Sequence, residues 1–260
     1  EILATAKTPT TPANPTLGAL AGVERVMAAS GGAWSQIEGF IHGTTLATNA
    51  LIERRGAVVA TVTTAGFRDI LEIAYERRYS QYDINLVKPD LIVPRARAFT
   101  IAGRMTASGD EVQPLDEGAV AELASDLASS GADAVAICLM HAYANPAHEI
   151  RLREMLQQAL PNIAISLSHE VSPEAREFDR LCTTIANAYI QPLMARYLAD
   201  FQTRFAQNGL LCPILMMTAG GGMTTLDTAA RLPIRLVESG PAGGAILAAR
   251  IAAEVGEREV

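Results

Sequence analysis

Apolar, β-branched runs alternate with amphipathic, alanine-rich runs along most of this 260-residue chain. GAVVATVTT and DAVAICLMHAY have the composition of buried strands, whereas EGAVAELASDLASSG has the spacing of a helix. Strands that alternate with helices predict an α/β fold with a largely parallel, mixed sheet and flanking helices. The apolar content of 49% is enough for one large core or two smaller ones.

Side-chain caps followed by proline predict three helix starts, at Asn14-Pro15, Asn145-Pro146 and Ser172-Pro173. The first helix is expected to end near Gly31-Gly32, and the third to reach about Asn208 with a kink or break at Pro192. Strands are expected within IEGFIHGTT, GAVVATVTT, DAVAICLMHAY, NIAISLSHE, PILMMTAGGGM and IRLVESG.

Two segments interrupt the alternation. Residues 77–94 are polar, aromatic and marked by proline, which predicts an ordered surface excursion. AFTIAGRMTASGDEVQPL predicts an inserted antiparallel hairpin that turns at Ser108-Gly109-Asp110, and Asp116 can cap the helix that follows it.

Charge and composition exclude several classes of partner. The formal net charge is −7 and no basic stripe opposes it, so we expect neither nucleic acid nor an acidic membrane surface as a partner. No apolar run reaches the roughly 18 residues of a membrane span, and EILATAKT has no export signal. Three widely spaced cysteines indicate free thiols in a reducing compartment, so the sequence predicts a cytoplasmic protein.

The segment HGTTLATNAL contains the first candidate site. A strand that ends in His42, Gly43, Thr44 and Thr45 before a helix presents backbone N–H groups and two hydroxyls, which suits an anion. Thr48 and Asn49 follow one turn later. The alternative is a capped helix in which a threonine satisfies the first free N–H groups.

SGPAGG contains the second candidate site. Gly240, Gly243 and Gly244 permit close approach of a ligand, while Ser239 suits a helix cap and Pro241 the first helical turn. The segment fits neither GxGxxG nor GxxxxGK[ST], so a plain helix start is again the alternative. A third glycine cluster, TAGGGMTTLD, is interpreted as a turn, with Asp227 as a first-turn carboxylate of a helix.

The histidines have no metal-ligand spacing, and the sequence predicts no metal site. His42, His141 and His169 each fall at or just after the end of an expected strand, the edge where parallel sheets bind ligands. His141 and His169, with the adjacent Glu170, are therefore weaker candidates for a cleft.

Several segments in a fixed order resemble the hydantoinase A and 5-oxoprolinase family. They are HGTTLATNALIERRGAVVATVTTAGFRDILEI, YDINLVKPDLIVPR, NPAHE, SHEVSPEAREFDRLCTTIANAYIQPLMARYL and SGPAGG. The resemblance runs from about Lys7 to the last residues. It implies residues 1–175 as the hydantoinase/oxoprolinase N-terminal region and 176–260 as the start of the hydantoinase A catalytic region, packed together as the first lobe of an actin-like (ribonuclease H-like) ATPase.

The resemblance also implies an activity. Family members open cyclic amides such as hydantoin, N-methylhydantoin or 5-oxoproline with ATP and magnesium, and phosphorylation of the amide oxygen makes its carbon a better electrophile. Two alternatives are a subunit of an ATP-dependent ketone carboxylase, of the acetone or acetophenone type, and a non-catalytic scaffold lobe. Each reading implies a hydantoinase B-like partner subunit or domain.

The chain departs from the family pattern in one respect. Both DxGGTxxD phosphate loops are absent, and the resemblance implies that the first would precede Glu1 and the second follow Val260. EILATAKT then corresponds to a late strand of the first hairpin, and the lack of an initiator methionine agrees with an incomplete lobe. Residues 1–260 alone are therefore expected to fold without hydrolysing ATP. Catalytic residues are not assigned.

Overall fold

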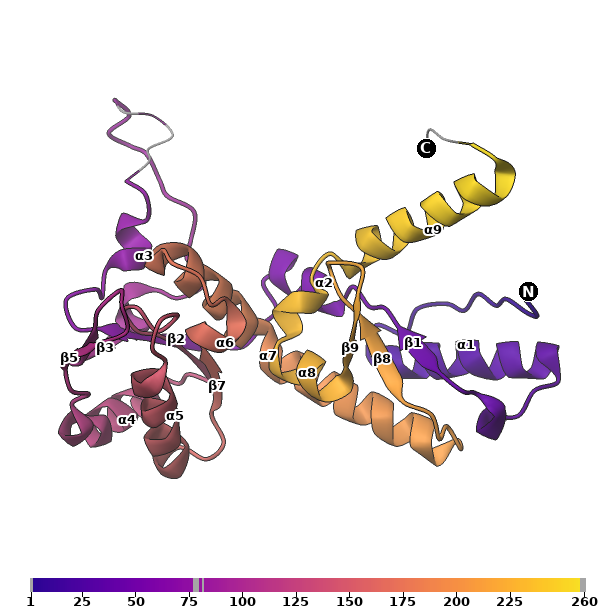
Figure 1. The fold of residues 1–260 in the computed structure, drawn as a ribbon, viewed down its shortest axis with the longest axis horizontal. Helices are drawn as coiled ribbons and strands as arrows, with labels where there is room; N and C mark the ends of the chain where they lie inside the picture. Colours follow the sequence, from indigo (N-terminus) through magenta and orange to yellow (C-terminus); the bar gives the residue numbers. More distant parts are fainter. Residues whose placement is uncertain (1, 77–79, 81, 258–260) are drawn as a thin grey trace. The chain divides into compact units, whose positions relative to one another are not determined.

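The computed structural model describes residues 2–76, 80 and 82–257 and divides into two compact units. Unit 1 comprises residues 1–49 and 193–260, and unit 2 comprises residues 50–192. The chain passes from one unit to the other within helix α2 (Leu46–Ile52) and again within helix α7 (Glu177–Gln207). Each unit is built on its own sheet (Figure 1).

Unit 2 contains a four-stranded parallel sheet in the order β3-β2-β6-β7. Its strands are β2 (Val59–Thr64), β3 (Ala98–Ile101), β6 (Ala134–Cys138) and β7 (Ala164–Leu167). Every residue of β2 and β6 is buried, which is typical of central strands covered on both faces.

Helices cover both faces of this sheet. Ala60 and Val62 of β2 pack in the core cluster with α4 (Val120–Ser129) and α5 (Ala147–Ala159), and these two helices lie on the same side of the sheet in Figure 1. On the other face, Asn187 in the first part of α7 donates a hydrogen bond to the Ser166 hydroxyl of β7. The alternation of the strand side chains thus supplies two helix-covered surfaces.

Unit 1 has a smaller mixed sheet in the order β1-β8-β9. Strand β1 (Phe40–His42) pairs in parallel with β8 (Ile214–Met217), and β9 (Met223–Thr225) returns antiparallel to β8. Phe40 packs against Phe201 and Phe205 of α7, with ring centroids 5.9 and 5.1 Å apart. An aromatic core therefore fixes β1 on the second part of α7.

The remaining elements are short or lie at the edges. They are α1 (Pro15–Ser30), α3 (Ile70–Ile73), β4 (Arg104–Met105), β5 (Glu111–Gln113), α6 (Ser168–Val171), α8 (Leu226–Arg231) and α9 (Ser239–Val255), with 3-10 turns at Trp34–Gln36, Arg95–Arg97, Glu117–Ala119 and Pro233–Leu236.

Most of the predicted helix starts are confirmed. The Asn14 side chain accepts a hydrogen bond from the Thr16 N–H, and α1 ends before Gly31, whose φ is 70°. Asn145 likewise accepts from the Ala147 N–H, and Asp116 accepts from the Ala119 N–H. The described part of the 77–94 excursion contains a turn at Ile84 and Asn85 and a few bends, but no helix or strand, while residues 77–79 and 81 lie outside the described residues.

Four predictions about local structure are wrong in whole or in part. The helix expected to begin after Ser172-Pro173 begins at Glu177, and Pro192 lies inside it without dividing it. The antiparallel hairpin that turns at Ser108-Gly109-Asp110 is present, but it is confined to β4 and β5, because Ala98–Ile101 joins the parallel sheet beside β2. IRLVESG forms no strand, since Pro233–Leu236 is a 3-10 turn. The helix containing SGPAGG begins at Ser239, before Pro241.

Candidate functional site

The HGTT segment forms the connection from β1 to α2 in unit 1. The Thr44 hydroxyl accepts a hydrogen bond from the Leu46 N–H at 3.2 Å, and Asn49 donates to the Thr45 hydroxyl at 3.3 Å. Thr44 therefore satisfies a free N–H at the start of the helix, as the capped-helix alternative expects.

The SGPAGG segment lies inside α9, and it contacts the HGTT helix. Glu238, with φ 65°, precedes the helix and donates its backbone N–H to the Thr48 hydroxyl at 3.2 Å. A Cβ added to Gly240 would lie 4.0 Å from the Thr45 methyl group. Segments about 190 residues apart in sequence thus meet in unit 1.

The glycines of SGPAGG differ in their surroundings. A Cβ on Gly243 would lie 2.7 Å from the Met217 sulfur at the end of β8, whereas one on Gly244 would meet nothing within 4 Å. Ser239 is buried, while Pro241 and Gly244 are exposed. Gly243 therefore allows α9 to approach β8, which is a packing reason for that glycine.

His42 lies at the end of β1 in an uncharged environment. Its Nε2 is 2.7 Å from the Tyr197 hydroxyl, and its ring stacks on Phe201 with centroids 4.4 Å apart. Burial lowers the pKa of His42 to about 4, and burial also raises the pKa of Tyr197 to about 12. The imidazole is therefore neutral at physiological pH, beside the HGTT connection.

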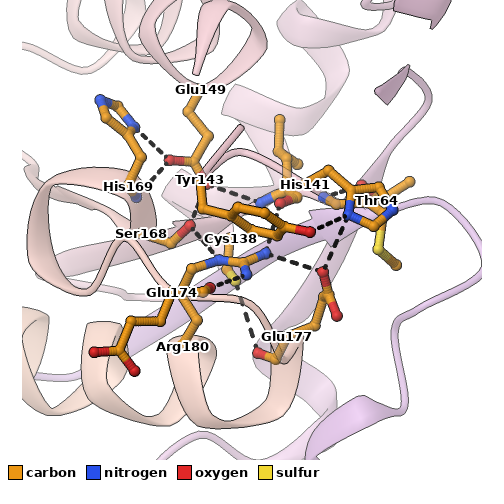
Figure 2. A network of polar contacts seen from close by, with 12 residues as sticks. Thr64, Cys138, His141, Tyr143, Glu149, Ser168, His169, Glu174, Glu177 and Arg180 are labelled. Carbon is orange, nitrogen blue, oxygen red and sulfur yellow. Dashed lines mark hydrogen bonds and ion pairs between the residues drawn. The ribbon is translucent and has the colours of Figure 1, made fainter. Parts of the chain in front are cut away.

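A second group of polar residues lies at the carboxyl ends of β6 and β7 in unit 2 (Figure 2). Its centre is Glu149 of α5, whose side chain is fully buried. The Glu149 carboxylate accepts hydrogen bonds from the Leu139 N–H, the Ser168 hydroxyl, and both the backbone N–H and Nδ1 of His169. The distances range from 2.6 Å for Ser168 to 3.1 Å for the His169 N–H.

Arg180 of α7 supplies the opposite charge and is also fully buried. Its guanidinium donates to the Ser168 hydroxyl, to the carbonyls of Leu139 and Glu174, and to the Glu177 carboxylate. Ser168 lies between Glu149 and Arg180 in Figure 2 and bonds to both. Each buried charge is thus compensated by hydrogen bonds, as burial of ions requires.

His141 lies at the rim of this network. Its φ is 57°, a left-handed conformation that residues other than glycine seldom adopt. Nδ1 of His141 is 3.1 Å from the Tyr143 hydroxyl and 3.9 Å from a Glu177 oxygen. A shallow pocket beside it is lined by Thr63, Thr64, Phe67, Ile70, Cys138, Met140, Glu177 and Leu181.

The sequence candidates therefore separate into two groups. HGTT and SGPAGG lie together in unit 1, while His141 and His169 lie at neighbouring strand ends in unit 2. Glu170 forms an ion pair with Arg153 at 2.8 Å, which is a contact outside both groups. Glu149, Arg180 and Tyr197 were not among the residues singled out from the sequence. Glu149 falls in NPAHE, and Arg180 and Tyr197 fall in SHEVSPEAREFDRLCTTIANAYIQPLMARYL, so these family segments carried the signal.

Three further observations concern chemistry outside these groups. Burial raises the pKa of the Cys138 thiol to about 12, which keeps it protonated. In the described part of the chain, no three histidine, cysteine or acidic side chains are grouped to hold a metal ion. Likewise, none of the described helices is long and apolar enough to cross a bilayer.

Comparison with known proteins finds a family that matches most of this chain. Residues 1–160 match the family described as "Hydantoinase/oxoprolinase N-terminal region", and residues 180–260 match "Hydantoinase/oxoprolinase". Caprolactamase subunit alpha from Pseudomonas jessenii is 34% identical over 91% of this chain and 35% of its own length. The 5-oxoprolinase 1 of Arabidopsis thaliana is 29% identical over 78% of this chain and 17% of its own length.

Two solved structures share the fold. The ATP-dependent caprolactamase from Pseudomonas jessenii superposes with a TM-score of 0.85 at 30% identity, over 98% of this chain and 38% of that one. Nucleotide-free acetone carboxylase superposes with a TM-score of 0.84 at 25% identity, over 95% of this chain and 37% of that one. The chain thus spans little more than a third of these two solved chains and about a sixth of the plant 5-oxoprolinase.

These likenesses define the fold class of the chain, which is an α/β protein with the architecture of an actin-like ATPase lobe. Within that class, the chain belongs to the hydantoinase/oxoprolinase family.

Proposed function

We propose that this chain is part of an ATP-dependent cyclic amide hydrolase that opens a hydantoin, N-methylhydantoin or 5-oxoproline ring through amide phosphorylation. The observation that carries the proposal is the 34% identity to caprolactamase subunit alpha over 91% of the chain. The 5-oxoprolinase relative supports it, because its name also denotes an enzyme of a cyclic amide.

In this proposal, HGTT and SGPAGG form part of the wall of the nucleotide or substrate cleft. The contact between the Glu238 N–H and Thr48 holds these segments together within unit 1. Neutral His42 accepts or donates one hydrogen bond at Tyr197 and brings no charge to the wall. ATP and magnesium are the cofactors of this proposal: ATP supplies the phosphoryl group that activates the amide, and magnesium offsets the charge of the phosphates.

The wider setting is also a proposal. Residues 1–175 and 176–260 form one lobe of a cytoplasmic enzyme, and the lobe works with a hydantoinase B-like partner. A relative named as subunit alpha supports a multi-subunit assembly. The cyclic amide binds where this lobe meets other parts of the assembly.

A second candidate is a subunit of an ATP-dependent ketone carboxylase. The likeness to acetone carboxylase favours it, since the TM-score of 0.84 is nearly equal to that of the caprolactamase. Both candidates require ATP, and they differ in the atom that is phosphorylated: an amide oxygen in one, and an enolate or carboxylate oxygen in the other.

The test measures phosphate release by the polypeptide that carries residues 1–260, purified with its partner subunit. Hydantoin, N-methylhydantoin, 5-oxoproline and caprolactam are compared with acetone and acetophenone, each with bicarbonate. Stimulation by a cyclic amide with stoichiometric ring opening supports the first candidate. Stimulation by a ketone only in the presence of bicarbonate replaces it with the second, and stimulation by neither rejects both.

The same assay tests the cleft wall through Thr44. Thr44→Ala removes the hydroxyl that accepts from Leu46, whereas Thr44→Asn keeps an acceptor at that position. If Thr44 lines the cleft, both variants lower kcat by about tenfold or more, the loss typical of one positioned catalytic hydrogen bond. Full activity of Thr44→Asn with a loss in Thr44→Ala would instead assign Thr44 to helix capping alone.

A further inference from the structure

The pocket beside His141 lies where the strand order of the parallel sheet in unit 2 changes direction. In the order β3-β2-β6-β7, the strand that follows β2 lies on one side, and the strand that follows β6 lies on the other. Thr63 pairs with Cys138 at the carboxyl ends of β2 and β6, and both residues line the pocket with Thr64 and Met140. Parallel α/β sheets bind ligands outside the carboxyl ends of their strands at such a point. The topology of this sheet therefore predicts a ligand at the pocket.

The walls of the pocket are apolar, because their hydroxyl groups bond within the protein. The Thr63 hydroxyl donates to the Phe67 carbonyl at 3.3 Å, and the Thr64 hydroxyl accepts from the Met140 N–H at 2.9 Å. The Arg104 guanidinium lies over the Phe67 ring, 5.4 Å from its centroid. These contacts fix the walls before a ligand arrives, which reduces the entropy lost on binding.

The size of the pocket limits the size of the ligand. The pocket encloses about 210 Å³, counted with its open mouth. This volume is below the roughly 300–1,000 Å³ of ordinary ligand pockets, and at about 30 Å³ per water-sized group it holds at most roughly seven such groups. A single small ring fits this space, whereas a nucleotide does not.

Two polar groups at the rim of the pocket have bonding capacity for a ligand. One oxygen of the Glu177 carboxylate accepts from Arg180 at 3.3 Å and lies 3.9 Å from Nδ1 of His141 (Figure 2). Among the described residues, no hydrogen bond occupies the other Glu177 oxygen or Nε2 of His141. The Glu177 and His141 side chains are 25% and 22% exposed. The left-handed φ of His141 is also a form of strain that clusters at ligand sites.

The chemistry of the rim selects a neutral ligand with a donor beside an acceptor. The Glu177 carboxylate repels anions and accepts from an N–H. Arg180 does not reverse this preference, because it is fully buried and its guanidinium bonds to protein groups. When the Tyr143 hydroxyl donates to Nδ1 of His141, 3.1 Å away, Nε2 carries the proton and donates to a carbonyl oxygen. An N–H beside a carbonyl is the polar edge of an amide.

We propose that this pocket binds a small, neutral cyclic amide. The amide N–H donates to Glu177, the carbonyl accepts from His141, and the ring packs on Phe67 and Ile70. HGTT and SGPAGG take no part in the pocket, since all its residues belong to unit 2. The choice of a cyclic amide over other small amides rests on the proposed function, whereas the pocket and its rim do not.

The experiment titrates caprolactam into the polypeptide that carries residues 1–260, without ATP, and follows the methyl NMR signals of Ile70 and Met140. N-methylcaprolactam is the matched probe, because it has the same ring and carbonyl but no N–H. We expect caprolactam to shift both signals. N-methylation should raise Kd by about tenfold or more, which is the effect of losing a hydrogen bond to a charged group.

Two pairs of variants locate the ligand. Ile70→Phe places a larger side chain in the pocket, and Ile70→Leu is its volume-conserving control. Glu177→Gln removes the charge at the rim, and Glu174→Gln removes a charge from a nearby exposed side chain. We expect Ile70→Phe and Glu177→Gln each to raise Kd for caprolactam by about tenfold or more, and both controls to leave it within about twofold.

Unchanged Ile70 and Met140 signals at the highest soluble concentration of caprolactam would reject the site. Equal Kd values for caprolactam and N-methylcaprolactam would reject it as well. If the melting temperature shows that Ile70→Phe is unfolded, Glu177→Gln and the wild-type signals decide the question. ATP turnover is measured separately: signal shifts without hydrolysis of a cyclic amide would support this site and reject the proposed function, and hydrolysis without signal shifts would do the reverse.

Discussion

His42 in unit 1 and His169 in unit 2 have similar positions in the sequence, at or just after the end of a strand, but opposite environments. His42 bonds to the Tyr197 hydroxyl and stacks on Phe201, with no charged partner among these contacts. His169 places Nδ1 2.7 Å from the fully buried Glu149 carboxylate. The strand pattern predicts where each histidine lies, but residues of distant helices decide whether its environment is apolar or ionic.

The difference has a physical consequence for each unit. Unit 2 uses buried charges, which are stable only while every partner remains in place. Unit 1 instead excludes charge at its strand end and keeps a titratable group neutral through burial. Unit 2 should therefore be sensitive to loss of a carboxylate, and unit 1 should be sensitive to acid.

The largest expected effect is that of Glu149→Ala in unit 2. The substitution removes the acceptor of four hydrogen bonds and the buried negative charge that Ser168 links to Arg180, so that Glu177 is the carboxylate left bonded to Arg180. We expect the free energy of unfolding to fall by about 3–5 kcal/mol, as when one partner of a buried ionic network is removed. Urea denaturation followed by circular dichroism measures it.

Glu154→Ala is the matched control on the same helix. The Glu154 side chain is 55% exposed and lies 3.5 Å from Arg151, so its loss should change stability by less than about 1 kcal/mol. Similar losses for Glu149→Ala and Glu154→Ala would contradict the contrast between the two units. Glu149→Gln adds a second comparison, because it keeps part of the hydrogen bonding without the charge.

The next effect is the acid sensitivity of unit 1. The pKa of His42 is about 4 in the folded protein, against the ordinary histidine value of 6.5 in the unfolded chain. Between these values the unfolded state binds more protons, so the free energy of unfolding falls as pH decreases from 6.5 to 4. The full contribution is present above pH 6.5, and its loss amounts to about 3 kcal/mol near pH 4.

Comparison with His42→Phe isolates this contribution. Phenylalanine keeps an aromatic ring beside Phe201 but cannot titrate, so the free energy of unfolding of wild type relative to the variant should fall by about 3 kcal/mol between pH 6.5 and pH 4. Other carboxylates and histidines contribute equally to both proteins and cancel in the difference. An NMR titration that places the pKa of His42 near 6.5 would reject the neutral, buried assignment.

The sequence could predict those parts of the fold that depend on residues close together in the chain, and not those that depend on distant residues. Caps such as Asn14 and Asp116 act on the next two or three residues, so their helix starts could be predicted. Ala98–Ile101 was assigned to a hairpin because its alternation fits either pairing, and only β2 determines that it joins a parallel ladder. Local pattern therefore identified the strand but not its partner.

In the candidate site, local sequence again identified segments but not the partners of their residues. Glu149 occupies the first turn of α5, where an acidic residue is ordinarily explained by the helix dipole. Its burial depends on Leu139, Ser168 and Arg180, which come from three other segments. SGPAGG was predicted to be either a ligand-binding segment or a plain helix start. Glycine disfavours helix, yet these glycines lie inside α9. Packing against β8 overrides that preference at one of them.

The smallest expected effect tests whether packing holds SGPAGG in unit 1, as the polar network holds the strand ends in unit 2. Gly244→Ala should raise the free energy of unfolding by about 0.5–1 kcal/mol, because its Cβ meets open space and alanine favours helix. Gly243→Ala gains the same preference but must displace the Met217 sulfur, and overpacking costs about 1–3 kcal/mol. In thermal and urea unfolding, the two variants should therefore change the free energy of unfolding in opposite directions or by clearly different amounts.

A double-mutant cycle with Met217→Ala identifies the cause of that difference. If the thioether is the obstacle, Gly243→Ala becomes stabilising in the Met217→Ala background, and the coupling between the two positions is large. Additive effects would mean that Gly243 is required for another reason, and a loss of turnover without loss of stability would point to the cleft. Comparison of the Gly243 and Gly244 variants thus distinguishes a glycine that is required for packing from one that is required for ligand binding.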